Sequence, residues 1–594
     1  MKNFFKYTLA TILGVIISSF FVIIIFVATI AAFVSTSVSE IQDESPKELE
    51  SHTILEIKLN EPIMDRASNN PMDNFNFQSF ETNKKLDLSK ILKNLKKAKD
   101  DENIDGIYLN LSSISTGIAS LEEIRNALID FKKSNKFIVS YADYYTQGTY
   151  YLASISDKIF LNPQGGLDFR GLSAEIMFYK SALEKVGIEP QIIRHGKFKS
   201  AVEPFMLDKM SESNRKQTSV FLKSIWDRMV KGISEERKIS VIDLNSYADK
   251  MSLKNAQASV DLKMVDALKF KDEIISELKR LSEKKENEDL EFVSLSSYTA
   301  VPKKKSGDGL IKEKIAVIFA QGEIQMGKGS EDVIGSERIS KAIREARLDS
   351  SIKAIVLRVN SPGGSALASE IILREVILAK EVKPVIASMG NYAASGGYYI
   401  ACAADTIVAS PTTITGSIGV FGLMFQGKKF LNDIGITVDN VKTNEHSDIG
   451  SMFRPMSTSE RAVIQESVEE IYDVFISHVA KGRGMEKNAV DNIGQGRVWT
   501  GANAKDIGLV DVLGGLDVAI NIAQEKAHLK KYRIISLPKQ KNPFENIFSE
   551  FSTKLQNEIM EYNLGENYKY YNRLQKIKTM KGTQARMPYH IDIY

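Results

Sequence analysis

The sequence predicts an α/β protein built from two tandem copies of one unit, preceded by a membrane-spanning helix. Three observations lead to this fold class. The chain repeats itself at a spacing of 248 residues, short apolar runs alternate with helical patterns in each copy, and the N-terminal stretch carries no charge. A chain of 594 residues is also too long for one core, because domains usually hold about 100–200 residues.

The N-terminal stretch has the length of a membrane span. Residues 8–34 are almost wholly apolar over 27 positions, two lysines precede them, and acidic residues follow from Glu40 onwards. A bilayer core needs about 20 such residues, whereas the apolar part of a secretory signal peptide has about 7–15. Because lysines stay on the cytoplasmic side, we expect residues 1–38 to form a single-pass anchor with a short cytoplasmic N-terminus and an extracytoplasmic body behind it.

The repeat aligns without a gap from Ile104 to Gly187, and the matches that follow come after small deletions. A shift of 248 positions places Ile104, Leu109, Gly148, Asp157 and Gly187 on Ile352, Leu357, Gly396, Asp405 and Gly435. In the second copy the pattern predicts strands at 352–359, 385–389 and 406–409 and helices at 366–380 and 396–404. Such alternation predicts βαβ units around a mostly parallel sheet.

Composition sets the expected boundaries of the two copies. We expect them at residues 53–280 and 315–542, joined by a charged, Ser- and Pro-containing linker at 281–314 and followed by a polar tail at 543–594. A single cysteine, Cys402, excludes an internal disulfide and a thiolate metal site, and the six histidines lack metal-binding spacing. A net charge of +3 does not favour nucleic acid. We therefore expect no cofactor, no metal and no nucleic acid partner.

Two glycine-rich turns in the second copy are candidates for chemistry. Residues 360–365 (NSPGGS) follow one predicted strand, and residues 393–397 (AASGG) join another strand to a helix. Glycines allow close approach of a substrate, and a serine at a helix N-terminus lies beside amides that favour negative charge. These turns predict a serine nucleophile and an oxyanion hole, although two ordinary tight turns would give the same pattern.

The first copy has lost these residues and holds a different one. Where the second copy has Gly363, Gly364 and Ser395, the first has Ser115, Thr116 and Gln147. Conversely, Lys199 of the first copy falls on Ser447 of the second. This complementary loss indicates one composite site made from two unlike halves.

The serine needs a base, and Lys199 is the favoured candidate. His195 and His446 have no histidine at the equivalent position of the other copy. Phe198 and Val202 flank Lys199 and indicate partial burial, which would lower the pKa of its amine and make it a usable base. Ser–Lys pairs are a known variant of the catalytic triad. Taken alone, Lys199 could equally be a surface lysine.

Four motifs resemble those of the bacterial signal peptide peptidases of the long SppA type, which are serine peptidases of the ClpP/crotonase-like fold. The motifs are VNSPGGS at 359–365, MGNYAASGGYYI at 389–400, TGSIGVFG at 415–422 and GKFKSAVEPF at 196–205. The resemblance extends over about residues 1–540. It implies a membrane-anchored endopeptidase that degrades signal peptides after their removal from secreted proteins.

The resemblance also implies a role for each motif. Ser395 would be the nucleophile, Lys199 the general base and Ser417 the group that orients the lysine amine. The amides around Gly363 and Gly364, with that of Ser395, would form the oxyanion hole. The family further implies a bowl-shaped homotetramer in the bacterial inner membrane, with a periplasmic body that takes apolar peptides.

Three other functions remain open at this point. A related membrane protease could act on other membrane or secreted proteins. A non-catalytic membrane scaffold could keep the fold, although it would not need Ser395 or Lys199. Acyl-CoA chemistry on a crotonase-like fold uses an oxyanion hole but needs no serine between glycines.

Overall fold

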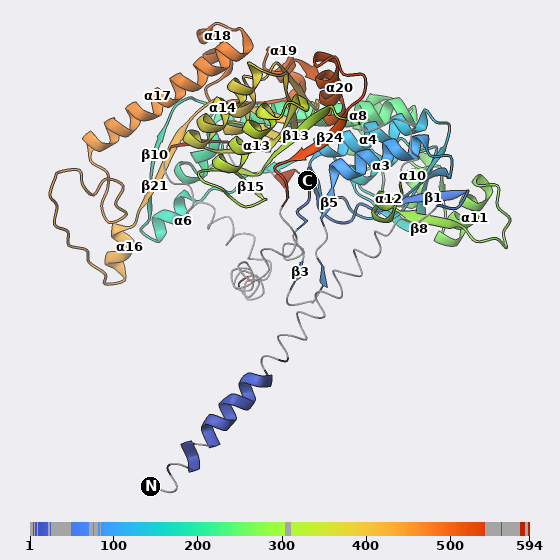
Figure 1. Ribbon diagram of the computed structural model, residues 1–594, viewed down its shortest axis with the longest axis horizontal. Coiled ribbons are helices and arrows are strands. Elements are labelled where there is room, and N and C mark those ends of the chain that lie inside the picture. The colour runs from blue at the N-terminus through green and yellow to red at the C-terminus, as the bar shows by residue number, and fades with distance from the viewer. Residues whose placement is uncertain are drawn as a thin grey trace.

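The computed structural model describes residues 4, 6–8, 10–21, 24, 49–69, 75–76, 81–82, 85–302, 311–540, 560, 583–587 and 592–593 (Figure 1). Residues 10–21 are helical. Over the positions just given, no helix combines the length and the apolar character needed to cross a bilayer. Residues 25–38 of the predicted anchor lie outside them.

The first repeat is a parallel sheet with helices on both faces. Its strand order is β11 (Ala267–Leu268), β8 (Lys158–Leu167), β7 (Phe137–Tyr145), β6 (Ile104–Asn110), β1 (Thr53–Ile57) and β12 (Glu291–Ser294). Neighbouring strand residues face opposite sides, as a strand period of two requires. Ile107 packs toward α3 (Leu88–Asp100) and α4 (Ile118–Lys132), and Tyr108 packs toward α11 (Lys271–Leu281).

The second repeat has the same plan. Its main sheet runs β22 (Val498–Thr500), β20 (Ile414–Gly416), β18 (Val385–Ala394), β16 (Ile352–Ser361), β13 (Lys314–Gln321) and β24 (Arg533–Leu537), with β19 (Thr406–Ala409) on β18 and β23 (Val512–Leu513) on β19. Helices α13 (Ser336–Leu348) and α14 (Ala366–Lys380) cover one face, and α20 (Leu516–Lys526) covers the other. The strands and helices predicted for this repeat are all present, but β16 and β18 continue two and five residues beyond their predicted ends, and α15 (Gly396–Ala401) ends three residues early.

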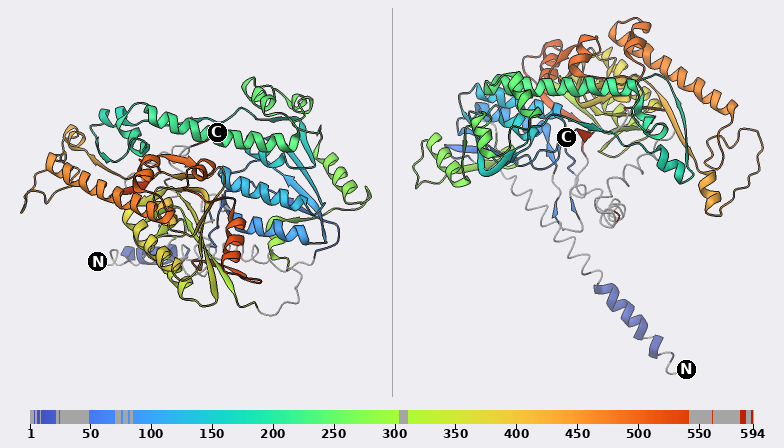
Figure 2. Two further views of the ribbon diagram at one scale, coloured as in Figure 1. Left: turned by 90° about the horizontal axis from the view of Figure 1, so that it is seen from above. Right: turned by 180° about the vertical axis from the view of Figure 1, so that it is seen from behind.

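Two long helices repeat the duplication in detail. Helices α8 (Glu212–Arg237) and α17 (Thr458–Arg483) each have 26 residues, and each begins after a serine whose side chain caps the first turn. Each ends at a residue in the left-handed conformation. Both lie on the upper side of the molecule (Figure 2). The matching boundaries confirm the repeat.

A third sheet joins the two repeats. Its order is β10 (Glu189–Arg194), β21 (Phe421–Gln426), β25 (Gln584–Arg586), β17 (Gly363–Ser365), β14 (Glu323–Gln325) and β15 (Val333–Gly335). Strand β10 of the first repeat pairs antiparallel with β21 of the second over six residues, from Glu189 opposite Gln426 to Arg194 opposite Phe421. The segment that follows β10, which contains Lys199, is thereby placed against the second repeat.

Two segments with linker-like or polar composition contain ordered strands. Within the expected linker, β12 and α12 (Leu295–Ala300) extend the first repeat and bury Val293 and Tyr298. Within the expected tail, β25 enters the third sheet, and β26 (Asp592–Ile593) pairs with β9 (Ala174–Glu175). Charge runs at 283–289 and 303–305 conceal the apolar residues of the linker, and β25 and β26 are too short for a strand pattern to show in the sequence.

A buried ion cluster connects the repeats. Arg358 of β16 lies 2.8 Å from Asp65 and 2.5 Å from Glu123, both of the first repeat, and none of the three is more than 5% exposed. The other oxygen of Glu123 accepts a hydrogen bond from the amide of Leu516 at 2.8 Å. Burial alone would lower the pKa of Arg358, but the two carboxylates raise it, so the guanidinium stays charged.

We expect Arg358→Leu to lower the free energy of unfolding by about 3–5 kcal/mol, because it leaves two buried carboxylates without their cation. Denaturant unfolding measures this change. Lys341→Ala is the control, since it removes an exposed pair with Glu345 and should change stability by at most about 0.5 kcal/mol. Equal effects of the two substitutions would contradict a role for the cluster in joining the repeats.

Candidate active site

Ser395 occupies a strained junction between β18 and α15. Its backbone has φ 56° and ψ −114°, a conformation that a non-glycine residue adopts only when its surroundings enforce it. A Cβ atom on Gly396 would lie 2.7 Å from Ser369 Oγ, and one on Gly397 would lie 2.7 Å from the Ser361 carbonyl. The two glycines are therefore needed for the helix to start this close to its neighbours, with the Ser395 side chain completely buried.

Lys199 meets Ser395 from the first repeat. It lies between β10 and the short 3₁₀ helix Ser200–Val202, and its Nζ is 2.8 Å from Ser395 Oγ. The same Nζ lies 3.1 Å from both the carbonyl oxygen and the Oγ of Ser417. The structure thus brings together the three side chains that the sequence analysis selected from separate motifs.

Burial determines the protonation state of Lys199. Its side chain is completely buried, and this desolvation lowers its pKa well below the ordinary value of 10.5. A neutral amine has two N–H groups and one lone pair. In the neutral form, an amine that donates its two N–H groups to the Ser417 oxygens would direct its lone pair at Ser395 Oγ, 2.8 Å away. This arrangement can accept the proton of the Ser395 hydroxyl.

Two of the backbone amides near Ser395 are hydrogen-bonded to neighbouring groups of the chain. The Gly363 N–H donates to Ser361 Oγ at 3.1 Å, and the Ser395 N–H donates to the Gly416 carbonyl at 2.8 Å. Both are thereby committed, which argues against the expected use of Gly363 and Ser395 as oxyanion donors. The amides of Gly396 and of Gly364, which lies opposite Ala585 of β25, are the remaining candidates beside the serine.

Three residues that support Lys199 were not found from the sequence. A Cβ atom on Gly496 would lie 2.6 Å from Lys199 Cα, and one on Gly419 would lie 3.3 Å from Lys199 Cδ. Gln217 of α8 donates to Ser200 Oγ at 2.8 Å, and its own oxygen accepts from the amide of Val498 in the second repeat at 3.2 Å. Glycines at 419 and 496 give the lysine room, and Gln217 fixes the segment that carries it. The TGSIG motif includes Gly419, but nothing local signals the other two.

The equivalent position of the first repeat is filled by a side chain. Gln147 Oε1 accepts hydrogen bonds from the amides of Arg170 and Gly171, both at 2.8 Å, and Nε2 donates to the Gly171 carbonyl at 2.9 Å. Gly171 is the repeat partner of Gly419, whose carbonyl lies 3.4 Å from Ser395 Oγ. The glutamine therefore satisfies the polar groups that would surround a second serine.

The two histidines considered as bases lie elsewhere. The ring of His195 is bound to Glu469 and stacks on Tyr472, with ring centroids 3.7 Å apart. His446 lies 3.4 Å from Glu460. Ser395 Oγ has Lys199 Nζ and the Gly419 carbonyl as its partners instead.

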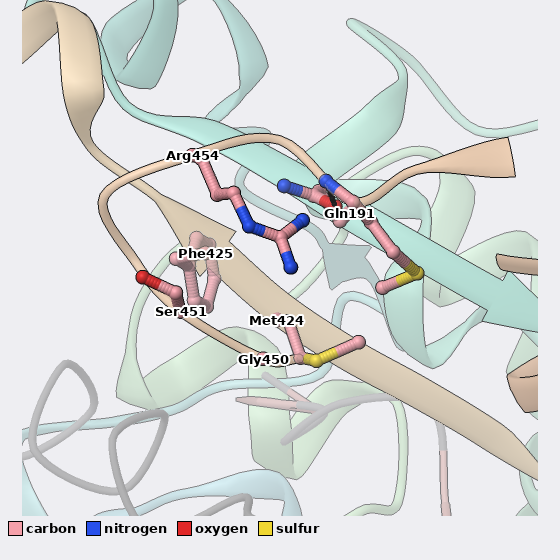
Figure 3. A pocket seen from close by; sticks show the side chains of 7 residues that line it. Gln191, Met424, Phe425, Gly450, Ser451 and Arg454 are labelled. Carbon is pink, nitrogen blue, oxygen red and sulfur yellow. Dashed lines mark hydrogen bonds between the residues drawn. The ribbon is translucent and has the colours of Figure 1, made fainter. Parts of the chain in front are cut away.

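A separate small hollow lies beside the β10–β21 pair. It is lined by Gln191, Met424, Phe425, Gly450, Ser451, Arg454 and Met456, and the Arg454 guanidinium points into it (Figure 3). That guanidinium is already held by Asp448 and Glu460, each at 2.6 Å. The hollow contains neither Ser395 nor Lys199, and its one cation is neutralised by its own neighbours.

A strained, buried serine hydroxyl within hydrogen-bond distance of a buried lysine amine, on a duplicated α/β scaffold, is typical of a serine peptidase. The chain belongs to peptidase family S49, whose sequence model matches residues 130–285 and 377–530. One matched region falls in each repeat, as in the long, duplicated form of the family.

Three similar proteins agree with this assignment. Protease 4 of Salmonella typhi is 39% identical over 458 residues, which cover 75% of this chain and 73% of that protein. Serine protease SPPA, chloroplastic, of Arabidopsis thaliana is 33% identical over 513 residues, which cover 85% and 74%. A putative signal peptide peptidase SppA of Enterococcus faecium is 34% identical over 235 residues, which cover 38% and 68%. The resemblance stated from the four motifs is confirmed.

We expect Lys199→Met to stabilise the protein in a pH-dependent way. Below pH 10.5 the unfolded chain binds a proton on Lys199 that the folded chain excludes, so wild-type stability falls as pH falls toward the folded pKa. Between pH 10.5 and the folded pKa, the free energy of unfolding of Lys199→Met should therefore gain on that of the wild type by about 1.4 kcal/mol for each pH unit that the pH is lowered. Unfolding at a series of pH values measures it, with exposed Lys341→Met as control. If the difference in free energy of unfolding between Lys199→Met and wild type does not change with pH, the pKa of Lys199 is not lowered by folding.

We expect Gly496→Ala to lower kcat by about 100-fold, because the added Cβ displaces Lys199 and misplaced catalytic groups lose rate steeply. Gly435→Ala is the matched control. Both glycines have φ 81°, but a Cβ on Gly435 meets nothing within 4 Å. Steady-state hydrolysis of a peptide compares the two variants. Equal losses would attribute the effect to backbone strain instead of Lys199.

Proposed function

We propose that this protein is a membrane-anchored serine endopeptidase that uses a Ser395–Lys199 dyad to degrade cleaved signal peptides. One observation carries the proposal. A completely buried lysine, with no carboxylate beside it to keep it charged, lies 2.8 Å from a strained serine hydroxyl. This geometry is useful for nucleophilic catalysis. It does not serve a structural role, since burying an amine without a counter-ion destabilises the fold.

The residues suggest the following order of events. Lys199 takes the Ser395 proton as Oγ attacks the peptide carbonyl carbon, and the amides of Gly364 and Gly396 stabilise the oxyanion. Lys199 then gives the proton to the departing amine, which leaves an acyl ester on Ser395. Water, deprotonated by Lys199, hydrolyses the ester. Ser417 orients the amine throughout through its two contacts at 3.1 Å.

The proposed substrates and location follow from the sequence and from the relatives. Cleaved signal peptides are apolar and stay near the bilayer, where the predicted anchor of residues 1–38 would hold the enzyme. We place the body on the periplasmic side of a bacterial inner membrane, in accordance with the lysines that precede the apolar stretch. The name of the Enterococcus faecium relative supports the same substrate class.

We also propose a homotetramer, for which the repeat gives a physical reason. Residues 437–442 are the repeat partners of β10, but no strand among the described residues pairs with them, and Val438 and Val441 are 50% and 100% exposed. Strand β9 is the repeat partner of the start of β21. Because β10 pairs with β21 within the chain, we infer that residues 437–442 pair with the edge of β9 opposite β26 in the next subunit. Such a head-to-tail contact forms a ring when its rotation closes.

The same dyad would serve a membrane protease with other membrane or secreted proteins as substrates. That function is the second candidate, and the choice between the two depends on the substrate alone. The buried Lys199–Ser395 contact argues against a non-catalytic scaffold. Acyl-CoA chemistry would need no serine in the strained position of Ser395.

We expect the full chain, purified in detergent, to hydrolyse a leucine-rich signal peptide, and both Ser395→Ala and Lys199→Ala to fall to background. Lys199→Met is a second test of the base, because it fills the same space and should be equally inactive. Gel filtration checks that the variants assemble like the wild type.

Two results would contradict the proposal. If Lys199→Ala stays active while Ser395→Ala is inactive, the base is another group. If the wild type cleaves membrane or secreted proteins but leaves signal peptides intact, the second candidate replaces the first.

A further inference from the structure

An aromatic stack holds the segment that carries Lys199. Strand β10 ends at Arg194, and His195 follows it, four residues before Lys199. The His195 ring stacks on the ring of Tyr472, with centroids 3.7 Å apart and an angle of 24° between the planes. Tyr472 belongs to α17 of the second repeat and is only 4% exposed. The stack therefore fixes the first-repeat chain just before the lysine to a helix of the second repeat.

The hydroxyl of the same tyrosine holds the loop that lies against Lys199. It donates to Asp491 Oδ1 at 2.5 Å and accepts the N–H of Gln495 at 3.2 Å. Gly496, the next residue, is the glycine whose added Cβ would lie 2.6 Å from Lys199 Cα. Tyr472 thus contacts both the chain that leads into the lysine and the loop that packs on it, one through its ring and the other through its oxygen.

This loop has a strained backbone that needs such contacts. Gln495 has φ 52° and Gly496 has φ 81°, so two consecutive residues are left-handed and the first of them is not a glycine. The Gln495 carbonyl accepts the N–H of Phe198 at 3.0 Å, and its N–H has the Tyr472 hydroxyl as its partner. Without that hydroxyl we expect the loop to relax away from Lys199 and to leave room for water beside it.

The equivalent position of the first repeat cannot do the same. Helices α8 and α17 have equal lengths, and Tyr472 of α17 corresponds to Trp226 of α8. The Trp226 indole N–H donates to Asn245 Oδ1 at 2.8 Å, as the Tyr472 hydroxyl donates to Asp491. An indole has a donor but no acceptor, so it cannot hold a backbone N–H. Of these two side chains, the one with an acceptor oxygen is in the repeat whose loop lies against the lysine.

We propose that Tyr472 is a positioning residue for the general base. Its ring holds His195 and its hydroxyl holds Gln495, so that Lys199 stays packed within reach of Ser395 and shielded from water. This inference rests on the proposed function and adds to it a residue of α17 that lies outside the catalytic group. It also gives His195 a role other than that of a base.

Loosening these contacts should change the amine in a defined direction. Burial alone lowers the pKa of Lys199, with no contribution from a neighbouring charge. Water that enters beside the amine would reverse part of this desolvation and raise the pKa toward 10.5. Because only the neutral amine can accept the serine proton, the acid limb of the pH–rate profile should move to higher pH. A tyrosine with a merely structural role would affect stability and leave this limb in place.

The first test is Tyr472→Phe in the full chain, purified in detergent, with hydrolysis of a leucine-rich signal peptide followed over a range of pH. We expect kcat to fall about tenfold with KM unchanged, because a misplaced catalytic group loses rate, and the acid limb to move to higher pH. Tyr298→Phe is the matched control, since it removes a hydroxyl that donates to Asp101 at 2.9 Å from a buried tyrosine of the first repeat. It should keep the wild-type kcat and profile.

Denaturant unfolding of both variants separates positioning from a loss of stability. If Tyr472→Phe keeps the wild-type kcat and acid limb, or changes only as Tyr298→Phe does, the inference is wrong. An active wild type and an inactive Lys199→Ala variant would then leave the proposed function standing. A wild type that hydrolyses no peptide would refute the proposed function, and the inference would fall with it.

The second test concerns the stack on His195. His195→Phe keeps an aromatic ring against Tyr472 but loses the bond to Glu469, whereas His195→Ala loses both. We expect His195→Phe to retain kcat within about twofold and His195→Ala to lose about tenfold, again with KM unchanged. Equal kcat values for the two variants, whether lowered or not, would overturn the role given to the stack.

Discussion

The desolvation of one amine is the constraint on which the rest of the structure depends. An ordinary lysine is neutral in only about one molecule in 2,500 at pH 7, and burial without a counter-ion is the simplest way to change that ratio. Such burial destabilises the fold, so it persists only where many other contacts hold the side chain in place. Around Lys199 these contacts come from both repeats: Ser417, Gly419 and Gly496 from the second, and Gln217 from the first.

The connection between the repeats is therefore part of the site. The six-residue pairing of β10 with β21 places Lys199 against the second repeat. The buried cluster around Arg358 fixes the two main sheets relative to each other. Duplication makes this arrangement possible. When two copies of a unit are packed together, one copy can keep the serine and the other the lysine, and each can lose the residue that the other supplies. Gln147 fills the unused centre and accepts hydrogen bonds from the amides of Arg170 and Gly171.

Much of the fold and the main residues of the site could be predicted from the sequence, because both leave local patterns. The bounds of α14 and β19 matched the expected ranges. The serine at 395 has no counterpart in the first repeat and the lysine at 199 has none in the second, and this difference predicted a composite centre from the sequence alone. What could not be predicted depends on pairing between distant segments. The amide of Gly363 donates to Ser361 Oγ, and Gly496 matters only because Lys199 lies beside it. Strands β12 and β25 are short, and their main partners, β1 and β17, lie far from them in the sequence.

The separation of Ser395 and Lys199 by 196 residues also has a consequence for how the protein is made. The half that carries the lysine is synthesised first, and its amine is solvated and protonated until the second half has folded against it. A growing chain therefore lacks the proposed dyad during synthesis, when other unfolded chains are exposed around it. The proposed activity therefore appears only when both repeats have folded together. A chain whose synthesis stops early, or that misfolds, would not cleave the proteins around it.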